Sequence, residues 1–443
     1  MTPTAPDNAR AWTPGFLKRE LGVFGAMMMG LGSIVGTGIF VSIGIAAGIA
    51  GPSVIVAVAI AALVATCNAL SSAQLAASHP VSGGTYEYGY AYLRPAFGFT
   101  AGWMFLCAKS ASAATAALGF AGYFLHAFGW SAERLVPVAI ATTVVLTAIV
   151  LSGIRRSNAA NIAIVCVTLA ALLAFVVAGL PSASEFGAEN LSPFFGSGTS
   201  EYSPAHGLLY ATALMFVAYT GYGRIATLGE EVREPRRTIP RAIVLTLIVS
   251  AVLYMVVCGV AIGAVGSAAL AQATEGEAAP LEVVAREFAV PGVHWVVAIG
   301  AMTAMLGVLL NLILGLSRVL LAMGRRRDMP SAVARLDGSR ATPYVAVTVV
   351  GLAVSALAAI GSVKTTWTFS AFTVLVYYAI TNLAALRLSG ADRLYPRVLA
   401  WCGLAACLFL AFWVEWRIWA VGLGLIAVGL AWRGAGWRLA RTS

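Results

Sequence analysis

Three features of this 443-residue chain could do chemistry within otherwise apolar sequence. Four glycines, a serine and a threonine interrupt the first long apolar run, within Gly30-Leu31-Gly32-Ser33-Ile34-Val35-Gly36-Thr37-Gly38-Ile39-Phe40. Small and polar residues interrupt a later run in the same way, within Leu214-Met215-Phe216-Val217-Ala218-Tyr219-Thr220-Gly221-Tyr222-Gly223-Arg224. The third feature is Lys109, the only lysine inside an apolar run.

The glycines of the first stretch predict a broken helix. Each glycine costs a helix about 0.5–1 kcal/mol relative to alanine. Unpaired backbone groups are expensive in a membrane, so irregular backbone persists there only where it is buried in protein or lines a cavity. We therefore expect residues 33–38 to leave the helix beside a functional cavity.

Together, the two interruptions could bind a small zwitterion. The half-helix that begins near Gly36 would present free N–H groups and the positive end of its dipole, which suit a carboxylate. Freed carbonyl groups, expected near Ser33, Ile34, Phe216, Ala218 and Tyr219, would suit an ammonium. The predicted substrate-binding residues are Ser33, Ile34, Gly36, Thr37, Gly38, Phe216, Ala218, Tyr219 and Gly221.

Lys109 is a candidate for proton coupling. Counted from Phe97, it lies roughly 18 Å into an apolar core that is about 30 Å thick. Charges at this depth are rare and are functional candidates, and a lysine removed from water can release its proton near neutral pH. The alternative is a structural lysine that binds the carbonyl groups of a helix end.

The elements that must position these residues are membrane helices. Hydrophobic residues make up 60% of the chain and charged residues 10%, against about 25% charged in a soluble domain. A span needs about 20 apolar residues, and about twelve such runs are present. The runs are 20–47, 52–77, 97–127, 134–153, 158–180, 204–229, 240–265, 292–324, 343–361, 366–388, 395–414 and 416–433.

The arginines and lysines predict the orientation of these spans. Alternate connections carry most of them, whereas the opposite connections hold acids such as Glu185, Glu275 and Glu277. Basic loops face the cytoplasm, so both termini are predicted to be cytoplasmic in a multi-pass protein of the cell membrane. The net charge of +10 is then explained by basic loops that face the anionic lipids of the cytoplasmic leaflet. We therefore expect the lipid bilayer, and not nucleic acid, as the partner.

The two interrupted runs lie five spans apart, and an odd offset inverts the second copy in the membrane. Paired interrupted helices of this kind indicate an inverted-repeat transporter with its site at the midplane. We expect a cytoplasmic segment at 1–19, a first five-helix repeat at 20–180 and an inverted second repeat at 204–388. Helices 11 and 12 would occupy 395–433, and a cytoplasmic tail 434–443.

Four motifs resemble the amino acid–polyamine–organocation (APC) superfamily. Gly32-Ser33-Ile34-Val35-Gly36-Thr37-Gly38-Ile39-Phe40 is similar to its helix 1 motif. The other three stretches are similar to its loop 2–3, its helix 6 to loop 6–7 and its helix 8 end, in that order. They are Pro80-Val81-Ser82-Gly83-Gly84-Thr85-Tyr86, Gly229-Glu230-Glu231 through Pro235 to Pro240, and Ser317-Arg318 with Asp328-Met329-Pro330.

This resemblance implies an all-α polytopic amino acid transporter with twelve helices, a five-plus-five inverted repeat and broken helices 1 and 6. It also implies that Ser33 to Gly38 and Phe216 to Tyr222 line the substrate site. One departure concerns coupling: proton-coupled members often carry a lysine in helix 5, where this chain has no ionisable residue. Lys109 is the only replacement candidate.

We therefore expect a secondary active transporter that moves amino acids by alternating access, with proton-linked uptake. The alternatives are an amino acid exchanger without proton coupling, a carrier of polyamines or organic amines, and a non-transporting sensor. An enzyme is not expected, because the sequence offers no nucleophile–base set, paired carboxylates or metal cluster at membrane depth. No cofactor or metal is expected.

Overall fold

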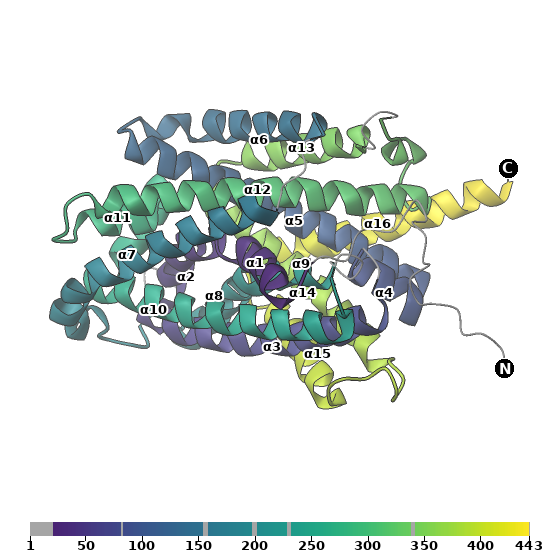
Figure 1. Ribbon diagram of the computed structural model, residues 1–443, viewed down its shortest axis with the longest axis horizontal. Helices are drawn as coiled ribbons and strands as arrows, with labels where there is room; N and C mark the ends of the chain where they lie inside the picture. Colours follow the sequence, from purple (N-terminus) through teal and green to yellow (C-terminus); the bar gives the residue numbers. More distant parts are fainter. Residues whose placement is uncertain are drawn as a thin grey trace, which may run out of the picture.

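The computed structural model describes residues 21–80, 83–153, 158–196, 202–227, 232–337 and 342–442, with backbone alone for 158 and 435–442. The described residues form an elongated bundle of helices (Figure 1). The predicted segment 1–19 lies outside them, as do Val81, Ser82 and Gly229-Glu230-Glu231 of the motifs.

The first interrupted run forms a helix that breaks as expected. α1 (Val23–Ile34) ends at Val35, whose backbone is extended at φ −79° and ψ 97°. The chain then forms a π-helical turn, η1 (Gly38–Ser42), and continues as α2 (Ile43–Ala50). A π-helical turn is rare and marks functional sites more often than chance.

The second interrupted run departs less from a helix than expected. α8 (Pro204–Tyr219) tightens into a single 3-10 turn, η4 (Thr220–Tyr222), and resumes as α9 (Gly223–Ala226). Tyr219 and Gly223 both keep right-handed helical backbone angles. Helix 6 therefore changes its pitch at the predicted position without unwinding.

The remaining helices account for the other predicted spans. Prolines begin several of them, at the first helical position where the missing N–H costs nothing. The helices are α3 (Val54–Ser78), α4 (Thr85–Tyr92), α5 (Pro95–Ala127), α6 (Leu135–Leu151), α7 (Asn158–Asn190), α10 (Pro235–Glu277), α11 (Pro280–Arg286), α12 (Val293–Arg325), α13 (Tyr344–Ala358), α14 (Val363–Leu386), α15 (Arg397–Ala411) and α16 (Trp416–Thr442). Short 3-10 turns occur at η2 (Gly51–Ser53), η3 (Ala132–Arg134) and η5 (Ser331–Ala334).

Length and composition agree with a polytopic membrane protein. Within the described ranges, eight helical stretches are apolar and long enough to cross a membrane, and the 56-residue stretch Val23–Ser78 contains two predicted spans. Three boundaries were predicted wrongly, and one of them is the end of the last span, which continues as helix to Thr442 instead of ending near 433. The fifth helix continues to Asn190 instead of ending near 180, and the seventh begins at Pro235 instead of Pro240.

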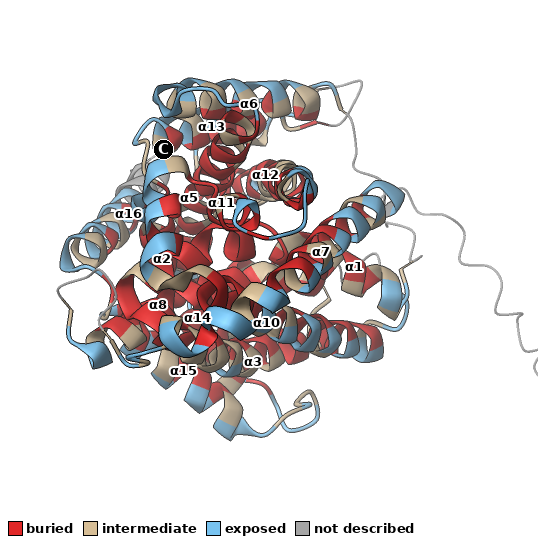
Figure 2. Cartoon of the chain, turned by 90° about the vertical axis from the view of Figure 1, so that its left-hand side faces the viewer, coloured by how far each residue is buried: buried red, intermediate tan, exposed pale blue. Residues whose placement is uncertain are grey.

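The two halves of the bundle interlock. α3 packs against α10, α5 against α12 and α6 against α13, so each helix contacts the helix five spans later. The fifth helix of each half also packs on the second and third helices of the other half. α7 lies on α10 and α12, and α14 lies on α3 and α5. Buried residues concentrate in the middle of this bundle, and α6, α15 and α16 lie at its rim (Figure 2).

The two ends of the bundle differ in charge. The end with α4, on the right in Figure 1, carries Arg325, Arg326, Arg327 and Arg433 and is called the basic end. The end with α11, on the left, is called the acidic end. It carries Glu133, Glu275, Glu277, Glu282 and Glu287.

Candidate functional site

The two interrupted helices touch backbone to backbone at the centre of the bundle. A Cβ atom on Gly221 would overlap the carbonyl of Ser33 and the nitrogen of Ile34. A Cβ atom on Gly38 would lie 2.6 Å from the Cβ of Ala218. Glycine is therefore required at 38 and 221 because the break in helix 1 and the turn in helix 6 approach too closely for a side chain.

A tyrosine of α10 bridges the same two interruptions. The hydroxyl of the fully buried Tyr254 donates to the carbonyl oxygen of Ile34 at 2.7 Å and lies 3.3 Å from that of Ala218. Two of the carbonyl groups predicted to be free for an ammonium are thus shared with a protein hydroxyl. Sequence reasoning missed Tyr254, although it is the only aromatic residue in the apolar run 240–265.

A small cavity lies where the interruptions meet. Its volume is about 40 Å³, room for two or three waters at about 10–15 Å³ each by this measure. An amino acid would have to widen it. The lining residues are Ser33, Ile34, Thr37, Gly38, Lys109, Ser112, Val217, Ala218, Thr220, Gly221, Val308, Leu312 and Trp367.

Most of the predicted site residues line this cavity, but three do not. Gly36 packs against α12, where an added Cβ would lie 2.6 Å from the Cγ2 of Val308. Phe216 packs edge-to-face on Tyr378. Tyr219 is fully buried, and its hydroxyl donates to the carbonyl of Val58 at 3.3 Å.

The break in helix 1 leaves polar groups without protein partners. Among the described residues, the backbone N–H groups of Gly36 and Thr37 have no backbone acceptor, and the buried hydroxyl of Thr37 has no hydrogen-bond partner. Buried polar groups are nearly always paired, so an unpaired one points to a ligand or water. Three donors thus gather at the start of η1, where the helix dipole favours a negative charge.

The other polar side chains that line the cavity are already hydrogen-bonded. The Ser33 hydroxyl donates to the carbonyl of Met29 at 3.0 Å, and the indole N–H of Trp367 donates to that of Leu214 at 3.1 Å. The Ser112 hydroxyl pairs with that of Ser370 at 2.7 Å. Thr37 is therefore the lining hydroxyl best placed to bind a ligand.

Lys109 lies beside the turn in helix 6. Its ammonium donates to the Thr220 hydroxyl at 2.8 Å, and that hydroxyl donates to the carbonyl of Val217 at 2.7 Å. Within the described ranges no carboxylate pairs with Lys109. An isolated buried charge is costly, so this position favours either loss of the proton or compensation by a bound anion.

Helix 5 reaches the break with an amide instead of a lysine. The side-chain N–H of Asn161, on α7, donates to the carbonyl of Met28 at 2.8 Å. Its oxygen is buried, without a partner among the described residues, and lies where a Cβ on Gly32 would collide with it. The amide ties α7 to α1 but carries no charge that could titrate.

Comparison with known proteins gives the family. A family model described as amino acid permease matches residues 25–435. A Mycobacterium bovis protein described as an uncharacterized transporter is 43% identical over 430 residues, which cover 94% of this chain and 91% of that protein. The branched-chain amino acid permease BcaP of Bacillus subtilis is 29% identical over 349 residues, covering 74% and 72%. The methylthioribose transporter of the same bacterium is 28% identical over 382 residues, covering 81% and 80%.

The motif-based resemblance is thereby confirmed. The matched region includes both interrupted helices and all the residues that line the central cavity. The family and these relatives are transporters and not enzymes. The protein belongs to the amino acid permease family of the APC superfamily.

Proposed function

We propose that the protein is a secondary active transporter of amino acids that works by alternating access and couples uptake to protons. The observation that carries this proposal is the set of unpaired donors at the helix 1 break, namely the N–H groups of Gly36 and Thr37 and the Thr37 hydroxyl. The N–H and hydroxyl of Thr37, which lines the cavity, would bind the substrate carboxylate, and the N–H of Gly36 would join them as the cavity widens around the substrate. The carbonyl groups of Ser33, Ile34 and Ala218 would receive the ammonium, the last two in exchange with the Tyr254 hydroxyl.

The wall of the cavity favours neutral substrates with apolar side chains. Val217, Val308, Leu312 and Trp367 form that wall, and no carboxylate lines the cavity in the described part of the chain. A polyamine or cationic side chain would meet the ammonium of Lys109 without a compensating acid. The relative named as a branched-chain amino acid permease supports the same class.

The orientation follows from the charges at the two ends. The basic end would face the cytoplasm and the acidic end the outside of the cell membrane. Both termini, residues 1–19 and 434–443, would then be cytoplasmic. The interlocked packing supports two inverted repeats at 20–180 and 204–388, with α7 extending the first of them to Asn190.

Proton coupling would run through Lys109. When the lysine is protonated, its ammonium holds the helix 6 turn through Thr220. When the proton leaves, the charge is removed and that hydrogen bond weakens. Protonation and deprotonation of Lys109 would thus strengthen and weaken in turn the hydrogen bond that holds one wall of the substrate cavity.

Exchange of one amino acid for another is the second candidate. It is favoured by one observation, the presence of Asn161 where helix 5 meets the break, because an amide cannot carry a proton through the cycle. An exchanger would need no titrating group at the site. Lys109 would then be a fixed structural contact to helix 6.

A thermal-shift screen of the purified full-length protein against all amino acids tests the substrate class. A ligand that binds only the folded state raises its stability by mass action, by about 2.7 kcal/mol at a hundredfold excess over the Kd. We expect stabilisation by leucine, isoleucine or valine and none by putrescine. Stabilisation by methylthioribose alone would refute the proposal.

Uptake into proteoliposomes tests the coupling. We expect Lys109→Met, which preserves volume and removes the charge, to abolish the response of uptake to an imposed pH gradient. Counterflow of labelled substrate without a gradient should persist in the same variant. An unchanged gradient response in Lys109→Met would assign coupling elsewhere, and a wild-type protein that shows counterflow but no gradient response would be an exchanger.

A further inference from the structure

A helical hairpin covers the acidic end of the bundle. Residue Gly266 interrupts α10 with non-helical angles, φ 80° and ψ 162°, so the segment 267–277 is a separate helix that leads into α11. Gly292, at φ 79°, ends the excursion before α12. Residues 267–286 are called the lid hairpin, and each flanking glycine adopts a backbone conformation that other residues rarely reach.

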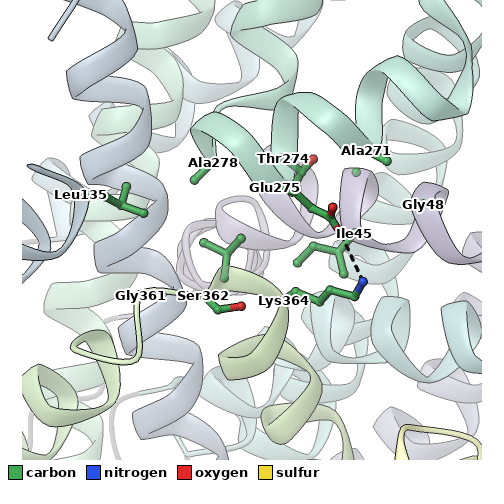
Figure 3. A pocket seen from close by; sticks show the side chains of 12 residues that line it. Ile45, Gly48, Leu135, Ala271, Thr274, Glu275, Ala278, Gly361, Ser362 and Lys364 are labelled. Atoms are coloured by element: carbon green, nitrogen blue, oxygen red, sulfur yellow. Dashed lines mark hydrogen bonds and ion pairs between the residues drawn. The ribbon is translucent and has the colours of Figure 1, made fainter. Parts of the chain in front are cut away.

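The lid hairpin closes one side of a second cavity (Figure 3). This cavity encloses about 250 Å³ between the lid hairpin, α2 and the start of α14. At its rim the Lys364 ammonium lies 3.1 Å from the Glu275 carboxylate. Thr274 fills the space beside Gly44 so closely that no side chain could be added there. Movement of the lid hairpin would therefore open or close this cavity.

Two carboxylates of the lid hairpin face one histidine at the end of α5. The Nε2 atom of His126 lies within ion-pair distance of the Oε2 atom of Glu277, at 2.7 Å, although that oxygen has no hydrogen-bond partner among the described residues; Nδ1 contacts Oε2 of Glu282. Glu282 is fully buried, and its other oxygen accepts from Nε of Arg286 at 2.8 Å. Arg286 also donates to the backbone carbonyl of His126 at 3.3 Å.

The charged form of the histidine makes both contacts favourable. A neutral imidazole has one N–H donor and one unprotonated nitrogen. The unprotonated nitrogen would place its lone pair against a carboxylate oxygen, whichever ring nitrogen kept the proton. With both carboxylates ionised, the two contacts are attractive together only in the imidazolium, so loss of the proton would replace one attraction with a repulsion.

We propose that His126 is a proton-binding site at the acidic end that latches the lid hairpin over the cavity beneath it. Histidine changes its charge between about pH 5 and 8. Protonation would hold Glu277 and Glu282 against α5, and deprotonation would leave the buried Glu282 with Arg286 alone. Acid would therefore close the lid hairpin, and neutral to alkaline pH would loosen it.

No other ion pair reaches His126 in the described parts of the chain. Several further charged or titratable side chains lie on elements that pack around α5 at this end, and these could tune the response. They are Glu133 and Arg134 of η3, Glu275 of the lid hairpin, Glu287 after α11, His294 of α12, Lys364 of α14 and Arg417 of α16. His126 is the histidine held between two carboxylates.

A tyrosine connects the latch to the substrate cavity. The hydroxyl of Tyr123, one turn before His126, donates to the carbonyl of Phe40 at 2.8 Å and accepts from the N–H of Leu281 at 3.2 Å. Phe40 belongs to η1, which follows the break in helix 1. Two hydrogen bonds through one side chain thus link the lid hairpin to η1, directly after the N–H groups that would hold a substrate carboxylate. Only this link to transport rests on the proposed function.

The equivalent contact at the basic end would not respond to the same pH range. There, α4 is fixed by Tyr86 and Tyr90, whose hydroxyls donate to the buried Asp328 at 2.7 and 2.6 Å. Burial, reinforced by the hydrogen bond to Asp328, raises the pKa of both tyrosines above the usual value. These donors keep their protons from acid to alkaline pH, so the contact between α4 and Asp328 should not respond in the range where a histidine titrates.

Spin-label distances in the full-length protein test the proposal without a substrate. Native cysteines are replaced by alanine, and Gln272→Cys on the lid hairpin is paired with Ala132→Cys on η3, both at exposed positions. The protein is placed in lipid nanodiscs at about pH 5.5 and about pH 8.5, which bracket histidine titration. We expect a single narrow distance at the lower pH and a longer, broader distribution at the higher one.

Three variants make the outcome specific. His126→Gln should give the broad distribution at both pH values, whereas His206→Gln, a histidine at the same end that stacks on Tyr202, should keep the wild-type response. The partly exposed Glu277→Gln should fold and broaden the distribution at the lower pH, because one of the two negative charges that face His126 is removed. A wild-type distribution that does not change with pH, or an unchanged response in His126→Gln, would overturn the proposal whatever the protein transports.

Discussion

Alanine substitutions at Gly36, in the helix 1 break, and at Gly221, in the helix 6 turn, would separate two reasons for glycine at the interruptions. At Gly36 the added Cβ would lie 2.6 Å from Cγ2 of Val308, which is the tip of a side chain. At Gly221 the added Cβ would overlap backbone atoms of Ser33 and Ile34. A side chain can be shortened, but a backbone cannot, so only the first substitution should be rescued by a second one.

The expected magnitudes follow from this geometry. Overpacking a filled interior costs about 1–3 kcal/mol, and we expect Gly36→Ala to fall in this range. Val308→Ala should itself cost about 1–2 kcal/mol, since it removes two methyl groups at about 0.8 kcal/mol each. In the double variant the shortened side chain makes room for the new methyl group. The coupling between the two sites should therefore be favourable by about 1–2 kcal/mol, within the range for contacting residues.

Gly221→Ala should behave differently because its neighbours are backbone atoms. Its cost should exceed that of Gly36→Ala, and it should force the break in helix 1 away from the turn in helix 6. Ser33→Ala shortens the nearest side chain without moving the carbonyl that the new Cβ meets. The Ser33→Ala/Gly221→Ala variant should therefore be no more stable than Gly221→Ala alone, which makes it a matched control for the rescue at Gly36.

Thermal unfolding of the purified variants, with and without the amino acid found in the ligand screen, measures both effects. We expect Gly36→Ala/Val308→Ala to recover stability and ligand binding, and Gly221→Ala to lose binding. Strict additivity of Gly36→Ala and Val308→Ala would refute the conclusion that the Val308 side chain is what excludes a side chain at position 36. A Gly221→Ala protein with wild-type stability and binding would refute the close contact between the interrupted helices.

Three further predictions follow from single contacts. Tyr254→Phe leaves the buried carbonyls of Ile34 and Ala218 without their shared donor, so we expect a loss of about 1–3 kcal/mol in unfolding free energy and weaker substrate binding, both measured by thermal shift. Asp328→Asn keeps one acceptor for Tyr86 and Tyr90 but removes the charge, and should increase hydrogen exchange of the amides of α4 while leaving those of α11 unchanged. Lys364→Met removes a half-exposed ion pair to Glu275, so the unfolding midpoint should barely move, in keeping with about 0–1 kcal/mol for such pairs; a large destabilisation would show that the rim pair is essential to the lid hairpin.

The break in helix 1 could be predicted because its signal is local. Glycines at 30, 32, 36 and 38 penalise a helix wherever they fall, and the structure breaks at Val35 between them. Lys109 could also be singled out, because a charge in an apolar run is visible without knowledge of its neighbours. Both predictions use only the free-energy cost of a residue within its own helix and in the membrane, so no knowledge of distant residues is needed.

The partners of these groups could not be predicted. Tyr254 lies 220 positions from the Ile34 carbonyl that it binds, and nothing near it in the sequence specifies that contact. His126 and Glu282 are 156 positions apart, and each alone has the composition of an ordinary helix end. Gly36 and Gly221 have the same chemistry, and only the packing shows that one faces a side chain and the other a backbone.

The contacts around the two interruptions explain why helix 1 unwinds and helix 6 does not. At the turn in helix 6, protein groups use the released polar atoms: Lys109 donates to the Thr220 hydroxyl, and Tyr378 donates to the Thr220 carbonyl at 3.2 Å. At the break in helix 1, the N–H groups of Gly36 and Thr37 have no such partners among the described residues. An extended link with unpaired donors is costly in a dry interior, and it is retained most simply where a ligand supplies the missing acceptor. We therefore expect the unwound helix 1 to bind the carboxylate that all amino acids share. The intact helix 6 turn would serve as the movable wall, which Lys109 holds or releases.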